Sequence, residues 1–212
     1  MELRYFGHAC VALRAASGQL LVMDPPEAQY GYLLPPLRPA AVTVSHSHRD
    51  HSGVGTLVPG GQIVQELGPV QVGDFQIVGA LAFHDGQHGA QRGEVRVYKV
   101  AVDGVAVAHL SDLGHPLTPE LRGFLAGVDL LLTPVGGVFT IDAAQAVQVI
   151  REVRPRFAAP IHYRTEQGSL QQLGDLPEFM ALWKGPKQRL EPGWQALPAA
   201  ADGETSVLEL SF

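Results

Sequence analysis

The chain has 212 residues, of which 46% are hydrophobic and 17% charged, with 21 acidic against 15 basic residues and a formal charge of -6. This composition favours a folded chain over a disordered one, and the length suits a single domain over residues 1–212. The acidic balance lacks the basic patch that a phosphate backbone requires, so we expect no nucleic-acid partner.

Features that would direct the chain to a membrane or out of the cell are missing from the sequence. Asp129 interrupts the longest apolar run, from Phe124 to Phe139, so no run reaches the roughly 18 residues of a membrane span. The N-terminus lacks the apolar segment of a signal peptide. Cys10 is the only cysteine, so no intrachain disulfide can form. We therefore expect a cytoplasmic protein with a small-molecule substrate and no membrane partner.

Short β-like runs separated by turn signals dominate the first half of the chain. The predicted strands cover residues 3–6, 10–13, 19–23, 41–44, 62–65, 70–72, 75–78, 95–102 and 105–110. Asp103 and Gly104 are expected to join the last two strands as a hairpin. The proline-rich segment 24–39 predicts a long irregular loop, and such loops often form the wall or lid of a site.

Helical signals follow in the second half. Thr118 provides an N-cap and Pro119 a first-turn proline for a helix that is expected to stop near Gly127. Asp142 is expected to cap a helix over residues 143–153, and a third helix is predicted over 176–183. Between the first two helices, the apolar run 130–132 predicts a strand that is buried on both faces. This order of strands and helices predicts an α/β fold in which helices cover sheets.

The most informative motif, His-x-His-x-Asp-His, follows the strand predicted over residues 41–44. In extended chain, residues two apart project to the same side, so His46 and His48 can hold one metal ion. Asp50 and His51, where the loop turns, can face a second ion. Imidazole nitrogen and carboxylate oxygen are ligands of zinc, and manganese or iron can use the same set. With only nine histidines in the chain, three within six residues favour a metal site over chance surface histidines.

This motif at the end of a strand resembles the signature of the metallo-β-lactamase superfamily, and the resemblance covers nearly the whole chain. Segments 6–10, 92–94 and 134–142 are also similar to a small group of prokaryotic Zn-dependent hydrolases that includes ascorbate-6-phosphate lactonase. The resemblance implies a four-layer αββα sandwich. It further implies two divalent metal ions, zinc first with Mn²⁺ or Fe²⁺ as alternatives, and hydrolysis of a small ester, lactone, amide or phosphoester.

The resemblance also implies a set of metal ligands. The first ion would be held by His46, His48 and His84, the second by Asp50, His51 and His162, with Asp112 as the bridge. Asp50 would in addition act in catalysis by accepting a proton or orienting the nucleophile. His88 is the rival of His84 as third ligand of the first ion. We prefer His84 because it directly follows an apolar strand and so has the more rigid mount.

Five further residues are candidates for contact with substrate or with the ligands. They are His8, His88, His115, Arg92 and Arg164. A structural role suits His8 and His115 equally well. Arg92 and Arg164 compete for the pairing of an anionic substrate group.

Two other functions are compatible with the histidine motif, namely a di-iron oxidoreductase on the same fold and a non-catalytic metal-binding protein. The related flavo-di-iron proteins carry a Glu within the motif and a flavin domain, whereas this chain has Arg49-Asp50 and no predicted second domain. The complete ligand set disfavours a protein without catalysis. The sequence thus predicts a metal-dependent hydrolase and leaves its substrate and oligomeric state open.

Overall fold

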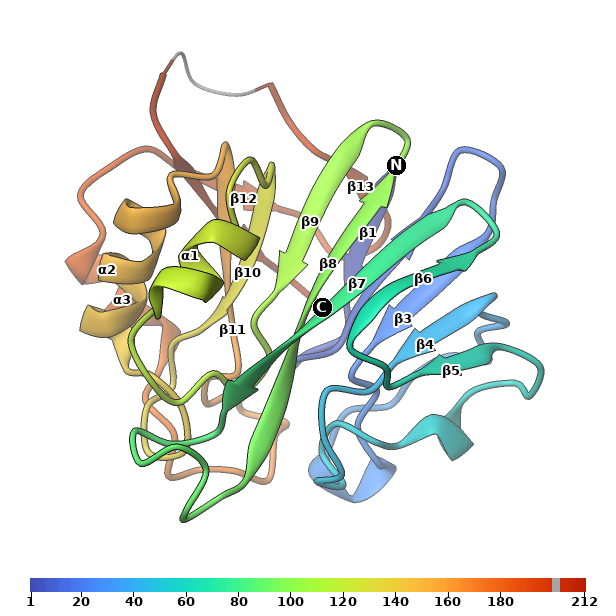
Figure 1. Ribbon diagram of the computed structural model, residues 1–212, viewed down its shortest axis with the longest axis horizontal. Helices are drawn as coiled ribbons and strands as arrows, with labels where there is room; N and C mark the ends of the chain where they lie inside the picture. Colours follow the sequence, from blue (N-terminus) through green and yellow to red (C-terminus); the bar gives the residue numbers. More distant parts are fainter. Residues whose placement is uncertain (200–202) are drawn as a thin grey trace.

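Two β-sheets pack face to face in the computed structural model, which describes residues 1–199 and 203–212 (Figure 1). One sheet contains β1 Glu2–Tyr5, β2 Val11–Arg14, β3 Leu20–Met23, β4 Ala41–Thr43, β5 Gln62–Val64 and β13 Gln195–Ala196. The other contains β6 Gly68–Val72, β7 Phe75–Phe83, β8 Glu94–Val102, β9 Val105–His109, β10 Leu130–Pro134, β11 Phe157–Ile161, β12 Lys187–Leu190 and β14 Ser206–Leu210. The strand orders are β13-β1-β2-β3-β4-β5 and β12-β14-β11-β10-β9-β8-β7-β6.

The α-helices lie together on the side of the eight-stranded sheet (Figure 1). They are α1 Pro119–Phe124, α2 Ala143–Val153 and α3 Leu176–Leu182, and short 3₁₀ helices cover Ala28–Tyr30 and Val54–Thr56. The predicted caps are confirmed, since Thr118 accepts a hydrogen bond from the Leu121 N–H and Asp142 forms a capping box with Gln145. None of the helices in the described ranges is long and apolar enough to cross a bilayer.

The central strands β2, β3 and β4 of the six-stranded sheet are buried on both faces. Alternate residues such as Val11 and Leu13 belong to the large core that the two sheets and the helices share. The intervening residues, Ala12 and Val22 among them, form a second apolar cluster on the opposite face. Leu37 belongs to that cluster, and no residue of an α-helix is in its described part. The α/β sandwich expected from the sequence is confirmed, with loops rather than α-helices over this second face.

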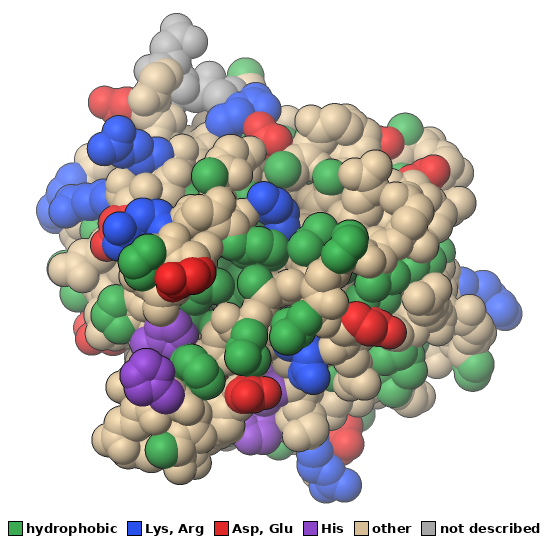
Figure 2. All heavy atoms as spheres, viewed as in Figure 1, with side chains coloured by type: hydrophobic (Ala, Val, Ile, Leu, Met, Phe, Trp, Pro, Cys, Tyr) green, Lys and Arg blue, Asp and Glu red, His purple; other side chains and the backbone are tan. Residues whose placement is uncertain are grey.

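Parallel strands direct the loops that carry the chemistry to one edge of the molecule. β3, β4 and β5 run parallel in one sheet, and β9, β10, β11 and β14 run parallel in the other. The strands β10 and β11 are buried along their whole length, as strands covered on both faces should be. On the face drawn in Figure 2, histidine side chains reach the surface only in the lower part of the molecule.

The pattern of residues predicts less of the C-terminal part. β12 alternates exposed and half-buried residues, and β13 has only two residues, so neither has the apolar run that marks a strand. Pro160 weakens the sequence signal for β11, although every residue of that strand is buried. The strand predicted over 75–78 in fact continues to Phe83, because small residues at Gly79, Ala80 and Ala82 weaken the apolar pattern without ending the strand.

Candidate metal centre

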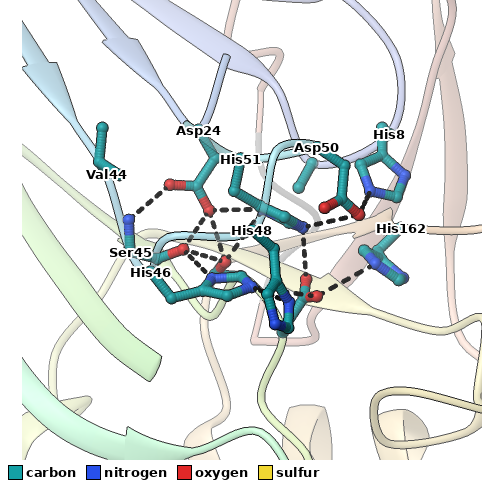
Figure 3. A network of polar contacts seen from close by, with 12 residues as sticks. His8, Asp24, Val44, Ser45, His46, His48, Asp50, His51 and His162 are labelled. Atoms are coloured by element: carbon teal, nitrogen blue, oxygen red, sulfur yellow. Dashed lines mark hydrogen bonds and ion pairs between the residues drawn. The ribbon is translucent and has the colours of Figure 1, made fainter. Parts of the chain in front are cut away.

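Three overlapping groups of possible ligands lie where the two sheets meet at this edge (Figure 3). In each group the ligand atoms lie within 4.8 Å of one another. The groups are His46, His48 and His84; His8, Asp50, His51 and His162; and His46, His51 and Asp112. The structure therefore brings together all seven residues that the sequence nominated as ligands, and it adds His8 to them.

Asp112 lies at the centre of this cluster. Its Oδ1 is 3.1 Å from Nε2 of His51, and its Oδ2 is 3.1 Å from Nε2 of His84 and 3.3 Å from Nε2 of His162. Gly114 helps to bring it there, because a Cβ at that position would lie 2.3 Å from the backbone carbon of His84. The carboxylate thus faces histidines of both proposed ion sites, as a bridging ligand must.

Several buried polar atoms at the centre have no hydrogen-bond partner within the described chain. They are Nε2 of His51, Oδ1 of Asp112 and both ring nitrogens of His162. An unsatisfied buried polar atom is costly, and native structures contain few of them. Divalent cations would take up the lone pairs of His51 Nε2, of Asp112 Oδ1 and of one ring nitrogen of His162, so the residues present fit a metal centre.

Asp24, which is not among the site residues predicted from the sequence, holds the cluster in place from the side of the core. It is fully buried, and its Oδ1 accepts a hydrogen bond from the backbone N–H of Ser45 at 2.8 Å. Its Oδ2 accepts from Nδ1 of His51 at 2.9 Å and from the hydroxyls of Ser45 and Ser111. This contact fixes the His51 ring so that Nε2 faces Asp112.

The other ring nitrogens of two further candidate ligands are fixed in the same way. Nδ1 of His84 donates to the backbone oxygen of Phe139 at 2.9 Å, which leaves Nε2 to face the cluster. Nδ1 of His46 lies 2.8 Å from the hydroxyl of Ser45. Contacts of this kind set the tautomer and the orientation of metal-binding histidines.

His8 lies against the second ligand group. Its Nε2 is 3.0 Å from Oδ2 of Asp50, and its ring is 4.2 Å from that of His162 and stacks on Tyr32 at 5.9 Å, centroid to centroid. Tyr32 belongs to the proline-rich loop, so this loop contacts the second ligand group through His8. Four residues here have left-handed backbone, with φ values of 54° for His8, 45° for Asp24, 47° for Ser111 and 52° for His162.

The buried setting controls the charge of these groups. Burial lowers the pKa of His8 to about 4 and that of His46 to about 3, so both imidazoles are neutral at neutral pH, the form that binds metal. Burial opposes ionisation of Asp50, but contacts with His51 and His8 outweigh it and hold its pKa below the usual value. Burial also opposes a charged His51, yet nearby carboxylates, Asp112 first, raise its pKa. A bound cation could replace that proton.

The remaining nominated residues lie at different distances from the cluster. His88 is exposed, its ring packs against Phe83, and it belongs to none of the ligand groups. His115 accepts a hydrogen bond from the backbone N–H of Phe83, a contact that holds the chain before His84. Arg164 is exposed and pairs with Asp175 at 2.9 Å.

A cavity of about 400 Å³ opens onto the metal centre. The candidate ligands His48, Asp50, His84 and Asp112 form part of its lining. The rest of the lining consists of Tyr30, Ser47, Arg49, Arg92, Phe139 and Leu170. Arg92 is therefore at the site, whereas Arg164 lines a separate cavity beside the C-terminal strand.

Comparison with known proteins gives consistent matches. The family described as "Beta-lactamase superfamily domain" matches residues 2–162. A UPF0173 metal-dependent hydrolase of Pyrobaculum calidifontis is 28% identical over an alignment of 191 positions, and the match covers 78% of this chain and 85% of that protein.

Solved structures share the arrangement of strands and helices. A Thermotoga maritima protein described as a Zn-dependent hydrolase of the metallo-β-lactamase superfamily is 28% identical, with a TM-score of 0.79 and 99% of each chain covered. Igni18, a metallo hydrolase of Ignicoccus hospitalis, has a TM-score of 0.64 over 84% of this chain and 88% of its own. At 23% identity, Igni18 shows a common fold alone.

The sandwich of two sheets, the histidine and aspartate cluster at its edge and these relatives together define the class of the protein, a metal-dependent hydrolase. The match over residues 2–162 identifies the family: the chain belongs to the metallo-β-lactamase superfamily.

Proposed function

We propose that the chain hydrolyses a small ester, lactone, amide or phosphoester at a centre of two divalent metal ions. The observation that carries this proposal is that Asp112 contacts histidines of two different ligand groups, at a centre where buried nitrogen and oxygen atoms have no hydrogen-bond partner within the described chain. His46, His48 and His84 would hold one ion, Asp50, His51 and His162 the other, and Asp112 would bridge them. When bound, such ions lower the pKa of a water molecule and polarise an oxygen of the substrate.

The residues of the chain supply orientation and proton transfer. Asp50 is half-buried at the cavity wall and ionised, so it can orient a water molecule or accept its proton. The hydrogen bond from Nε2 of His8 holds the Asp50 carboxylate in place. The neighbouring side chains Phe139 and Leu170 limit the access of bulk water to the cavity.

We further propose zinc as the native metal and the cytoplasm as the location. The ligands supply imidazole nitrogen and carboxylate oxygen, a donor set that zinc takes readily and that Mn²⁺ and Fe²⁺ can also use. The single cysteine, Cys10, is buried and free, which suits a reducing compartment.

Metal analysis of matched variants tests the centre. Protein purified without chelator is expected to hold about two ions per chain. His48→Ala should lose about one of them and Asp112→Ala both, because His48 belongs to one ligand group and Asp112 faces both. His88→Ala is the matched control and should keep both ions. Full occupancy in His48→Ala and Asp112→Ala would show that these ligand assignments are wrong.

A substrate screen tests the reaction. The metal-loaded protein is assayed on simple esters, lactones, thioesters and phosphodiesters, with Asp50→Asn as the variant that keeps the size of the proposed base. We expect hydrolysis of at least one class and a fall in kcat of about 100-fold or more in the variant. Consumption of oxygen with no hydrolysis would instead support the di-iron alternative. Bound metal with neither reaction would support a non-catalytic role.

A further inference from the structure

We infer that Arg92 forms an anion-binding subsite in the metal cavity, and that the substrate carries a carboxylate or phosphate group separate from the bond that is cleaved. This inference rests on the proposed hydrolysis, because it names the class of substrate for that same cavity. Its basis is the way in which the loop over residues 84–93 mounts the Arg92 side chain.

The backbone of Arg92 is held by the carboxylate of Asp85. Asp85 accepts four backbone hydrogen bonds at 2.8 to 3.0 Å. The donors are the N–H groups of Gln87, Gly89, Gln91 and Arg92. The same loop is closed at its base, where the N–H of His84 donates to the oxygen of Gly93 at 3.0 Å. Arg92 is thus fixed relative to His84, one of the proposed ligands.

The side chain of Arg92 is aimed by an aromatic ring. Its guanidinium carbon lies 5.2 Å from the centroid of Phe139, within the range of a cation–π contact. The backbone oxygen of that same Phe139 accepts the hydrogen bond from His84. One residue therefore contacts both the guanidinium and a proposed ligand, which places the cation beside the reacting centre.

The charge of Arg92 has no partner among the described acidic residues. Arg49, the other arginine of the cavity, lies 3.4 Å from a carboxylate oxygen of Glu27. Asp50 and Asp112 also line the cavity, but their ion pairs within the described chain are with histidines. Arg92 is half-buried, and its planar guanidinium can bind a carboxylate or phosphate in bidentate fashion.

The other residues that line the cavity indicate the size and polarity of the rest of the substrate. Tyr30, Phe139 and Leu170 give the wall an apolar surface, and the volume of about 400 Å³ is that of a small-molecule site. The ligand that fits is a small molecule with an anionic group at Arg92, an apolar linker and a carbonyl or phosphoryl group at the metal centre.

A pair of esters of equal size tests the subsite. The monophenyl ester of succinate and the phenyl ester of 4-methylpentanoate have the same number of non-hydrogen atoms and the same leaving group, and only the first carries a carboxylate. The wild-type ratio of kcat/KM for the two esters is expected to favour the succinate ester by about 10–100-fold, and Arg92→Gln should bring the ratio close to one. Arg49→Gln, which removes the cation already paired with Glu27, should change the ratio by less than about threefold.

A binding measurement gives a readout besides activity. Calorimetric titration with succinate and, separately, with inorganic phosphate should show binding about tenfold or more weaker in Arg92→Gln than in wild type. The stronger of the two titrations identifies the carboxylate or the phosphate as the preferred group. The metal content of the variant, measured in parallel, should equal that of wild type.

The results that would overturn the inference differ from those that would overturn the hydrolase proposal. Equal binding of both anions by wild type and Arg92→Gln, or a ratio that Arg92→Gln leaves unchanged, would refute the subsite. Failure of wild type to cleave any ester, lactone, thioester or phosphodiester would refute the proposed reaction, while the titrations would still decide whether Arg92 binds anions.

Discussion

Asp24 is the residue that connects the two sheets at the metal centre. Its carboxylate joins Ser45, which precedes the histidine motif, to Ser111, which precedes Asp112. It also orients His51. A single buried carboxylate therefore holds together two segments that lie 66 residues apart in the chain. The hydroxyls of Ser45 and Ser111 themselves approach to 2.7 Å.

Removal of the Asp24 charge should weaken metal binding. In Asp24→Asn the size is kept, but the amide cannot accept all the hydrogen bonds that the carboxylate accepts, so the His51 ring loses its fixed orientation. Loss of such an outer contact typically costs about 10–100-fold in metal affinity. Competition with a chelating dye measures the Kd for zinc. Asp74→Asn, at an exposed turn, is the control and should bind as wild type does. Equal affinities in all three proteins would contradict the prediction.

The sequence predicts the proposed ligands of the centre better than it predicts the residues that hold those ligands in place. His46, His48, Asp50 and His51 are close in the chain, so their proximity follows from local geometry alone. Asp24 lies in a proline-rich loop with no spacing relation to the motif, and only the parallel pairing of β3 with β4 places it beside Ser45. That pairing is a long-range contact, which the local pattern cannot reveal. The one available signal was its position directly after an apolar strand.

At the scale of elements, Tyr98 connects one sheet to the other. It lies on β8, is fully buried, and its hydroxyl lies 3.1 Å from the backbone oxygen of Val64 and 3.4 Å from that of Val44. Both carbonyls belong to or adjoin the six-stranded sheet. Burial, aided by the nearby Asp24 charge, raises the pKa of the Tyr98 phenol far above its usual value.

This shift predicts a loss of stability at alkaline pH. The folded-state pKa of Tyr98 lies above the unfolded value of about 10, so its contribution to stability is complete below about pH 10 and is lost as the pH rises toward the folded value. Tyr98→Phe should cost about 1 kcal/mol at about pH 8, through the lost hydrogen bond, but should show a smaller fall in stability between about pH 8 and pH 11. Urea unfolding at both pH values measures the difference. Parallel losses in the two proteins would rule out this role for Tyr98.

The elements themselves are predictable where apolar periodicity is strong. The capped helices α1 and α2 and the buried strand β10 follow directly from their residues. The layer that covers the second face of the six-stranded sheet could not be predicted from apolar periodicity. Leu37 and Leu57 cover it from loops, and loop residues carry no periodic signal that assigns them to a face.

At the scale of the whole molecule, the centre is built from both sheets. His46, His48, Asp50 and His51 follow β4 of one sheet, whereas His84, Asp112 and His162 follow β7, β9 and β11 of the other. Bound ions would therefore crosslink the two halves of the sandwich. They would also neutralise part of the formal charge of -6, to which Asp50 and Asp112 contribute.

Removal of metal should lower the thermal stability of the whole fold. An ion that binds only the folded state at about 1,000 times its Kd adds about 4 kcal/mol, which for a chain of this size raises Tm by roughly 8–16 °C. Calorimetric scans of chelator-treated protein, with and without restored zinc, measure the effect. Asp112→Ala is the matched variant and should not respond to zinc. A Tm that zinc leaves unchanged in wild type would show that the ions do not join the two sheets energetically.

The left-handed backbone at His8, Asp24, Ser111 and His162 has a consequence for how this protein can change. Each such residue is held at a cost of about 1 kcal/mol or more, which a glycine would not carry. A glycine at any of the four positions would release that strain, but at His8, Asp24 or His162 it would remove a side chain of the centre. Ser111 contributes only a hydroxyl, which donates to Asp24. Ser111→Gly would therefore relieve the strain with the smallest loss of contacts at the centre. The strain at Ser111 is thus the part of the centre's conformational cost that one substitution could remove while every proposed ligand is kept.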